Sequence, residues 1–267
     1  SLSSLFNIPV DMEPLAEIRT KMRDRSLPAK EREKLRKQYA DELANVLSDP
    51  IKREKIRKLT AEGCPDCPNY VMMFYWDSLC ITRAKKNTHL LGKTLDEVAE
   101  DRKREQILNS LFWSISPPID PFDVAADLYI EEKEDLYTSG DWMSKDDMKC
   151  VMKENWLMFA SDGSSLPIGA KNPVHPRNYG NFPRIFRKYV REEGVITLED
   201  AVRKMTSLPA SALKLKDRGL LKVGNKADVV IFDPNKVEDI ATFLEPHQFS
   251  KGFEYVIVNG KVSIEKG

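Results

Sequence analysis

The sequence predicts an α/β protein, and three patterns along its 267 residues indicate that class. Charged segments with apolar residues at helical spacing occupy residues 13–60 and several later stretches. A continuous apolar run at residues 156–161 is typical of a strand buried on both faces, as in a parallel sheet. Beyond Pro209, short alternating runs separated by turn residues predict a small β domain.

The first 60 residues predict helices. Pro28 is expected to start the second of them, Asp49-Pro50 to end it, and residues 51–59 to form a short basic helix. Apolar residues recur at helical spacing in two stripes, Leu15, Ile18, Met22 and then Leu35, Tyr39, Leu43 and Val46 or Leu47. These stripes are the expected buried faces of the first two helices.

The middle of the chain carries strand and capping signals. Short buried strands are predicted at residues 70–76 and 79–82. Thr94, with Glu97 three residues later, forms a capping box that predicts a long helix. The helices expected from here to Pro209 cover residues 94–114, 122–134, 144–153, 182–193 and 197–206, with Ser144 and Thr197 as caps of the third and fifth.

Turn residues organise the last 60 residues. The turn segments Arg218-Gly219-Leu220 and Val223-Gly224-Asn225 are expected to flank short strands, and residues 227–232 to form another strand that ends at Asp233-Pro234. Asn259-Gly260 between two alternating runs predicts a hairpin of residues 255–258 and 261–264.

Composition limits the class of function. Lys plus Arg and Asp plus Glu number 42 each, so no general attraction to nucleic acid or an anionic membrane follows. The basic clusters at residues 30–37 and 52–58 are interleaved with acidic residues, which favours a solvated helix face over a nucleic-acid site. No stretch approaches the roughly 20 apolar residues of a membrane span, and residues 1–10 lack a secretory signal. We expect a cytoplasmic protein that binds neither nucleic acid nor membrane.

The four cysteines are too few for a disulfide scaffold and predict reduced thiols. The Cys-Pro-Asp-Cys run at residues 64–67 has the spacing of half a zinc knuckle, but Cys80 and Cys150 are not spaced as the second pair. Two unpaired thiols in a loop are therefore the favoured interpretation of this run.

Asp162 is the candidate catalytic residue. It follows the predicted strand at residues 156–161, and Gly163 and a loop rich in Gly and Pro come next. In an α/β barrel the active site lies at the carboxyl ends of the strands. A carboxylate there can bind a metal ion or take a proton from metal-bound water. Taken alone, Asp-Gly after a strand is more often simple turn chemistry.

The residues after Asp162 carry a more specific signal. In chain order they include His175-Pro176-Arg177, Tyr179-Gly180, Leu198-Glu199-Asp200-Ala201, Met205-Thr206, Leu208-Pro209-Ala210, Ala227-Asp228, Phe232-Asp233-Pro234, Ala241-Thr242-Phe243 and Val258-Asn259-Gly260. In this order and spacing, residues 156–264 closely resemble the C-terminal part of the N-acyl-D-amino-acid deacylases (D-aminoacylases) of the metal-dependent amidohydrolase superfamily. The His-Pro-Arg, Phe-Asp-Pro and Ala-Thr-Phe elements point to the deacylase branch.

The resemblance implies the C-terminal portion of a TIM-barrel amidohydrolase with a helical cap insertion and part of a small β-sandwich domain. Residues 1–155 would be the cap that follows barrel strand 7. Residues 156–206 would be the last barrel strand and its helices with the catalytic loop, and residues 207–267 the C-terminal part of the β domain.

The same resemblance implies zinc-dependent hydrolysis of the amide bond of small N-acyl amino acids of D configuration. Zinc polarises the acyl carbonyl and lowers the pKa of a bound water. Asp162, also a metal ligand, accepts the proton of that water and passes it to the leaving amine. Arg177 is the candidate for the substrate carboxylate, and His175 for the oxyanion or for holding the loop. Structural hydrogen bonds are the alternative for Arg177 and His175.

The histidines depart from the pattern of that family. Relatives carry a His-x-His pair and two more histidines, whereas this chain has three, at positions 89, 175 and 247, and no such pair. Zinc catalysis needs about three protein ligands and an open position. We therefore expect a fragment or subunit that is inactive alone and is completed by the missing barrel half or by a homo-oligomer. The alternative is a non-catalytic binding or assembly protein derived from the barrel.

Overall fold

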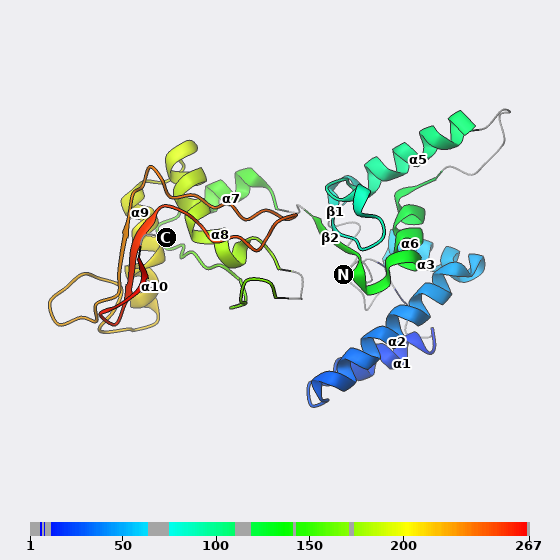
Figure 1. Cartoon of the computed structure of the whole chain (residues 1–267), viewed down its shortest axis with the longest axis horizontal. Helices are drawn as coiled ribbons and strands as arrows, with labels where there is room; N and C mark the ends of the chain where they lie inside the picture. Colours follow the sequence, from blue (N-terminus) through cyan, green and yellow to red (C-terminus); the bar gives the residue numbers. More distant parts are fainter. Residues whose placement is uncertain are drawn as a thin grey trace. The chain divides into compact units, whose positions relative to one another are not determined.

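The structure is a computed structural model that describes residues 6, 8, 12–63, 75–109, 119–140, 143–170 and 174–265. It divides into two compact units, Ser1–Trp142 and Met143–Gly267, and each is described by itself (Figure 1). Helices and strands are mixed in both units, in agreement with the α/β class. The two strand pairings of the second unit and the one of the first are all antiparallel.

Unit 1 is mainly helical. Its elements are α1 (Leu15–Met22), α2 (Ala29–Ser48), α3 (Pro50–Glu62), η2 (Trp76–Ser78), β1 (Leu79–Arg83), η3 (Thr88–Leu90), α5 (Leu95–Asn109), α6 (Pro121–Glu132), η4 (Lys133–Asp135) and β2 (Tyr137–Gly140). Helix α2 packs against α1 and α6, and α5 packs against α6. The helices predicted before residue 60 and the strand predicted at residues 79–82 are confirmed. Most of the strand predicted at residues 70–76, and the Cys-Pro-Asp-Cys run, lie outside the described residues.

Side-chain caps place the starts of these helices. The Asp49 carboxylate accepts hydrogen bonds from the backbone N–H groups that open α3. The Thr94 hydroxyl accepts from Glu97 N–H at 3.2 Å while the Glu97 carboxylate accepts from Thr94 N–H at 2.8 Å, so the predicted capping box is confirmed. The Asp120 carboxylate caps α6 by accepting from Asp123 N–H at 2.8 Å. Each cap satisfies backbone donors that the helix itself leaves unpaired.

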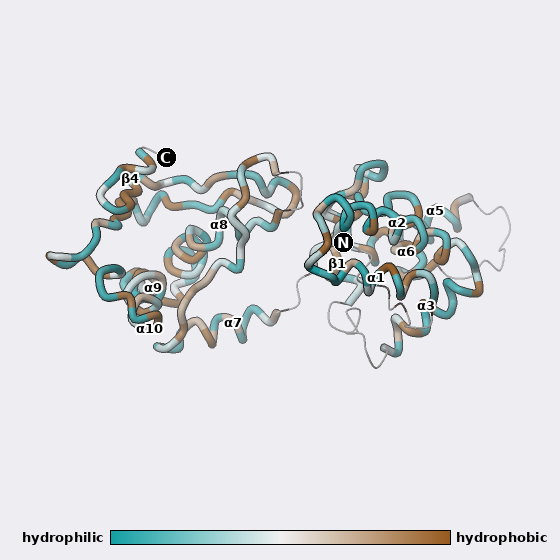
Figure 2. The backbone as a smooth tube through the Cα atoms, turned by 90° about the horizontal axis from the view of Figure 1, so that it is seen from below, coloured by the Kyte–Doolittle hydropathy of each residue, from teal (hydrophilic) through white to brown (hydrophobic). Residues whose placement is uncertain are grey.

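One apolar core holds unit 1 together. Residues with essentially no exposed surface include Leu15, Leu43, Leu47, Ile56, Ile81, Leu95, Leu128 and Leu136. They come from α1, α2, α3, β1, α5 and α6 and from Leu136 just before β2. Phe6 adds edge-on ring contacts to Phe122 and Tyr129. Figure 2 shows hydrophobic and hydrophilic residues alternating along these helices, the pattern of amphipathic helices that bury one face.

Unit 2 carries shorter helices and a three-stranded sheet. Its elements are α7 (Lys145–Met152), α8 (Arg177–Arg184), the π-helical segment η5 (Ile185–Glu192), α9 (Leu198–Met205), α10 (Ser207–Ala212), β3 (Val229–Phe232), β4 (Phe253–Val258) and β5 (Lys261–Glu265). The sheet has the order β3-β4-β5 (Figure 1). The predicted caps Ser144 and Thr197 are confirmed, and so is the hairpin, whose turn residues Asn259 and Gly260 both have positive φ.

The strand predicted at residues 156–161 is wrong. Trp156 is in a turn and the rest of the segment has no regular secondary structure and belongs to neither sheet. Its residues alternate between exposed and half-buried, with Trp156 66% exposed. A fully buried parallel strand needs neighbouring strands on both sides, and the described residues supply none for this segment. One backbone bond, from Phe159 N–H to Lys204 O at 3.2 Å, ties it to α9 instead.

Two further predictions in unit 2 need correction. The helix expected at residues 182–193 begins at Arg177, because Pro176 has helical φ and ψ and leads into α8. The short strands expected around residues 218–225 are replaced by bends and turns. Their alternating apolar residues do not pack on the sheet: Leu221 is 82% exposed and Val223 fully so. Period-two alternation without a surface to cover is insufficient to form a strand.

Candidate active site

The candidate catalytic residue Asp162 lies on a tight turn. Its φ is +46°, a left-handed conformation that aspartate adopts more readily than most residues. The Ser161 hydroxyl accepts a hydrogen bond from Gly163 N–H at 3.2 Å and closes the turn. The Asp162 side chain is 85% exposed. The turn therefore presents the carboxylate to solvent directly after the apolar segment of residues 156–161.

Helix α8 holds this turn through two amide side chains. The Asn178 side-chain oxygen accepts from Ser164 N–H at 3.3 Å, and the Asn181 amide donates to Ala160 O at 3.2 Å. The approach is so close that a Cβ on Gly163 would lie 3.0 Å from the Asn178 side-chain oxygen and 3.1 Å from its Cα. Close contact with α8, rather than φ, therefore favours glycine at position 163.

Arg177, the predicted substrate ligand, lies beside Asp162. Its Nη2 atom is 2.9 Å from Asp162 Oδ2, and both side chains reach solvent. An ion pair with this exposure contributes little to stability. Its value is positional, because it keeps a cation and a carboxylate next to each other on one open surface.

His175 completes the group. Its Nδ1 atom accepts a hydrogen bond from Arg177 N–H at 3.0 Å, in the loop that leads into α8. The Phe243 ring stands edge-on to the imidazole with ring centroids 4.9 Å apart. Burial lowers the pKa of His175, and the Arg177 cation lowers it further, while Asp162 acts in the opposite direction. The imidazole is therefore neutral at neutral pH, with Nδ1 as acceptor.

The structure thus brings all three predicted site residues together. The residues that hold them were not predicted. Asn178 and Asn181 lie three positions apart on one face of α8, a spacing that could have indicated a shared task. Phe243 was recognised only as part of the Ala-Thr-Phe element, and no local pattern indicates its contact with a histidine 68 positions earlier.

A complete metal centre is not formed by these residues. No group of three or more His, Cys, Asp or Glu side chains that could hold a metal ion occurs within the described ranges. Asp162 alone offers one ligand. The donor set of the described residues thus does not fit a zinc site, which needs about three protein ligands.

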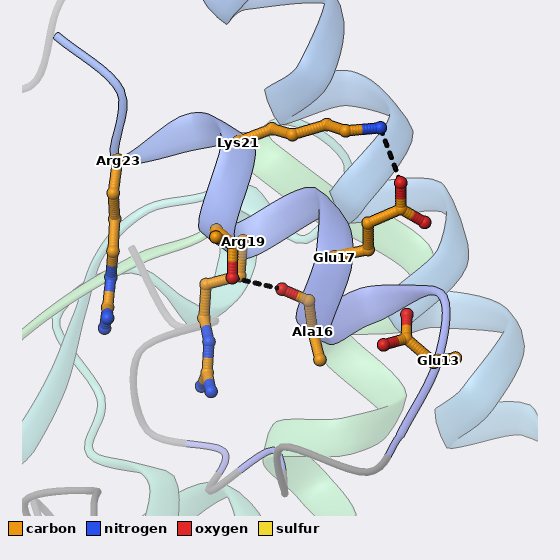
Figure 3. Close-up of a pocket in the computed structure, with 7 residues that line it drawn as sticks. Glu13, Ala16, Glu17, Arg19, Lys21 and Arg23 are labelled. Carbon is orange, nitrogen blue, oxygen red and sulfur yellow. Dashed lines mark hydrogen bonds and ion pairs between the residues drawn. The ribbon is translucent and has the colours of Figure 1, made fainter.

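Unit 1 contains a polar hollow of about 410 Å³ along α1. Figure 3 shows Arg19 and Arg23 extending to the same side of the helix, while Lys21 pairs with Glu17 at 2.6 Å. The hollow is open and belongs to unit 1, whereas Asp162, His175 and Arg177 belong to unit 2. The salt bridge between Lys21 and Glu17 joins two adjacent turns of one helix at the surface. This hollow is therefore not the candidate active site.

Comparison with known proteins decides the family. Residues 123–264, more than half of the chain, match the model described as the amidohydrolase family. The chain belongs to the amidohydrolase family. The match includes the whole candidate site and the sheet of unit 2. Among the described residues of this amidohydrolase chain, no helix combines the length and the apolar character that a membrane span requires.

Within the family, the similar proteins include deacylases of D-amino-acid derivatives. The chain is 47% identical over 118 residues to an N-acyl-D-glutamate deacylase of Alcaligenes xylosoxydans xylosoxydans, covering 44% of this chain and 23% of that protein. It is 36% identical over 180 residues to a D-aminoacylase of the same organism, covering 67% and 32%. The chain thus spans a third or less of these relatives. The resemblance to D-aminoacylases is confirmed.

Solved structures agree. A crystal structure of D-aminoacylase matches with a TM-score of 0.51 and 32% identity, over 70% of this chain and 34% of that one. The N-acyl-D-glutamate deacylase of Bordetella bronchiseptica matches with a TM-score of 0.51 and 31% identity, over 70% and 35%. That protein was crystallised with zinc and a phosphonate that mimics the tetrahedral intermediate of its reaction. The coarse fold of this chain is therefore that of part of an amidohydrolase.

Proposed function

We propose that this chain is the C-terminal part of a metal-dependent hydrolase that cleaves the amide bond of small N-acyl-D-amino acids. The observation that carries the proposal is the convergence of Asp162, Arg177 and His175 within residues 123–264, which match the amidohydrolase family. The similarity of the chain to an N-acyl-D-glutamate deacylase, 47% identity over 118 residues, supports it. As further parts of the proposal, residues 1–155 are a helical cap, residues 156–206 end the barrel, residues 207–267 contribute to a β-sandwich, and the protein acts in the cytoplasm.

The three side chains have distinct chemical roles in this proposal. The exposed Asp162 carboxylate is the base that accepts the proton of the attacking water and delivers it to the leaving amine. Arg177 binds the substrate carboxylate, which its planar guanidinium can hold through two parallel hydrogen bonds. The neutral His175 accepts Arg177 N–H at Nδ1, which leaves its other ring nitrogen as a donor toward the oxyanion.

The ion pair between Asp162 and Arg177 fits an empty site. Their 2.9 Å contact occupies the guanidinium that the substrate needs. A substrate carboxylate replaces Asp162 as the partner of Arg177, and Asp162 is then free to act as a base. Substrate binding and release of the base are thereby one event.

Zinc is proposed from the relatives. The described residues form no group of three or more ligands around Asp162, so we assign the remaining ligands to polypeptide beyond the described residues, either the missing barrel half or a second copy. When bound, zinc supplies Lewis-acid activation of the carbonyl and of water. This chain alone is expected to be inactive.

The test is an assay of the complete reading frame that contains this chain. The purified protein is loaded with zinc and given N-acetyl-D-glutamate, N-acetyl-D-leucine and their L enantiomers. Asp162→Asn should lower turnover by several orders of magnitude with the fold intact, because the amide cannot accept a proton. Asp233→Asn, a change of the same kind at a carboxylate outside the candidate site, is the matched control. Near-normal rates in the Asp162 variant would show that the assignment of the base is wrong.

The second candidate, a non-catalytic binding or assembly protein, is favoured by one observation, the incomplete ligand set of the described residues. It predicts that the complete product binds no zinc and hydrolyses none of the four substrates. Stoichiometric zinc together with hydrolysis of a D substrate would exclude it.

A further inference from the structure

The loop after Asp162 is held at its far end. Residues 163–170 carry the chain away from the catalytic turn, and Val174 and His175 bring it back into α8. The residues of this loop are mostly exposed and form no helix or strand. A loop of this kind is fixed only by contacts from other segments.

Tyr179 and His247 supply those contacts. The Tyr179 hydroxyl lies 3.2 Å from Leu166 O and 3.3 Å from Pro167 O and donates to these carbonyls. His247 Nδ1 accepts a hydrogen bond from Gly169 N–H at 3.2 Å. The same ring nitrogen is 3.4 Å from the Tyr179 hydroxyl, so the two side chains adjoin. Together they bind three residues of one loop, Leu166, Pro167 and Gly169. We call these two residues the clasp.

The segment that bears His247 is itself anchored on both sides. Asp239, 5% exposed, accepts from Arg187 Nε at 2.6 Å and from Arg184 Nη1 at 3.3 Å. At the other end the Ser250 hydroxyl donates to Tyr179 O at 2.8 Å. Between these anchors Phe243 contacts His175. Residues 239–250 therefore form a strap that touches the site loop at His175 and at Gly169.

We propose that His247 is a positioning residue of the candidate active site, which it reaches through Gly169 and not through substrate. This inference rests on the proposed function for its catalytic meaning. The strap fixes His247 against α8. His247 and Tyr179 in turn fix the loop of residues 163–170 that directly follows Asp162. Loss of the acceptor at position 247 frees the loop and misplaces the base relative to the arginine.

The first test measures amide hydrogen exchange in the full chain. His247→Phe retains a planar ring but removes the acceptor, and the Gly169 amide should then exchange about fivefold faster, the effect of one hydrogen bond. His247→Asn keeps an acceptor near the position of Nδ1 and should restore the slow rate. His89→Phe is the matched control, because His89 is an exposed histidine of unit 1. Unchanged Gly169 exchange in His247→Phe overturns the proposal.

The second test uses the complete enzyme. His247→Phe should lower kcat roughly tenfold or more, as expected of a misplaced catalytic group, while KM changes little, and His247→Asn should recover most of the loss. If His247→Phe speeds hydrogen exchange at Gly169 but has the same kcat as the wild type, the positioning role is overturned. If the wild-type enzyme hydrolyses none of the substrates, the proposed function fails, while Gly169 exchange still reports on the clasp.

Discussion

Asp239→Asn is the sharpest test of how unit 2 holds its site. The change preserves the shape of the side chain but removes its charge. The Asp239 carboxylate is only 5% exposed and lies between two arginines. The short contact to Arg187 changes from a charge-assisted bond of about 1.5–3 kcal/mol to a weaker one of about 0.5–1.5 kcal/mol. The longer contact to Arg184 counts for less because that arginine is half-exposed. Arg187 keeps Glu192 at 2.9 Å, which prevents the full cost of an unpaired charge.

These contributions sum to about 2 kcal/mol, or roughly a 30-fold increase in local opening. Because the chain has two units, a single unfolding transition is not expected, and exchange of amides in η5 and in residues 239–250 is the appropriate measurement. Asp233→Asn is the control, since Asp233 contacts only Lys236 at 3.6 Å among its ion pairs and should shift exchange by less than twofold. If the two variants behave alike, the buried carboxylate does not anchor the strap.

Three further outcomes are expected. Gly163→Ala should disturb the turn that carries Asp162, because the added Cβ would press on Asn178. Overpacking should lower the free energy of unfolding by about 1–3 kcal/mol, and the Ser164 amide should exchange hydrogen faster. An unaltered exchange rate would contradict the contact. Because the pKa of His175 is lowered in the folded protein, the stability of unit 2 should fall as pH drops below the ordinary histidine pKa of 6.5. Phe243→Ala should admit water to the imidazole and so raise the pKa of His175 in an NMR titration. Burial opposes ionisation of Glu132, but the hydrogen bonds from the N–H groups of residues 85–87 outweigh burial and lower the pKa of Glu132. Unit 1 should therefore lose stability as pH falls through the range where carboxyl groups titrate. Glu132→Gln should flatten this pH dependence in acid-unfolding measurements.

Features set by neighbours in sequence were predictable. Thr94 and Glu97, Ser144, Thr197 and the Asn259-Gly260 turn all act within three residues, so their residue types alone indicate the local structure. The strand at residues 156–161 was wrong for the opposite reason. An apolar run indicates that a segment is buried, but it does not show which polypeptide buries it.

The candidate site was predicted through resemblance rather than through pattern. Asp-Gly after an apolar run is ambiguous, and nothing local connects Asp162 with Arg177 fifteen positions later. The supporting contacts are more remote still: Arg187 to Asp239 spans 52 positions and Gly169 to His247 spans 78. Such pairs depend on how segments pack, and single-residue propensities contain no information about that.

The location of the supporting contacts explains why the site is formed without a parallel sheet around it. Asp162 is held by Asn178 and Asn181, and the loop beyond it by Tyr179, all on the first turns of α8. Arg177 begins the same helix. The helix, rather than a ladder of strands, therefore sets the distance between the Asp162 carboxylate and the Arg177 guanidinium. It follows that these two groups are arranged within unit 2 alone. Under the proposed function, the metal and the walls of the cavity are what polypeptide beyond the described residues has to add.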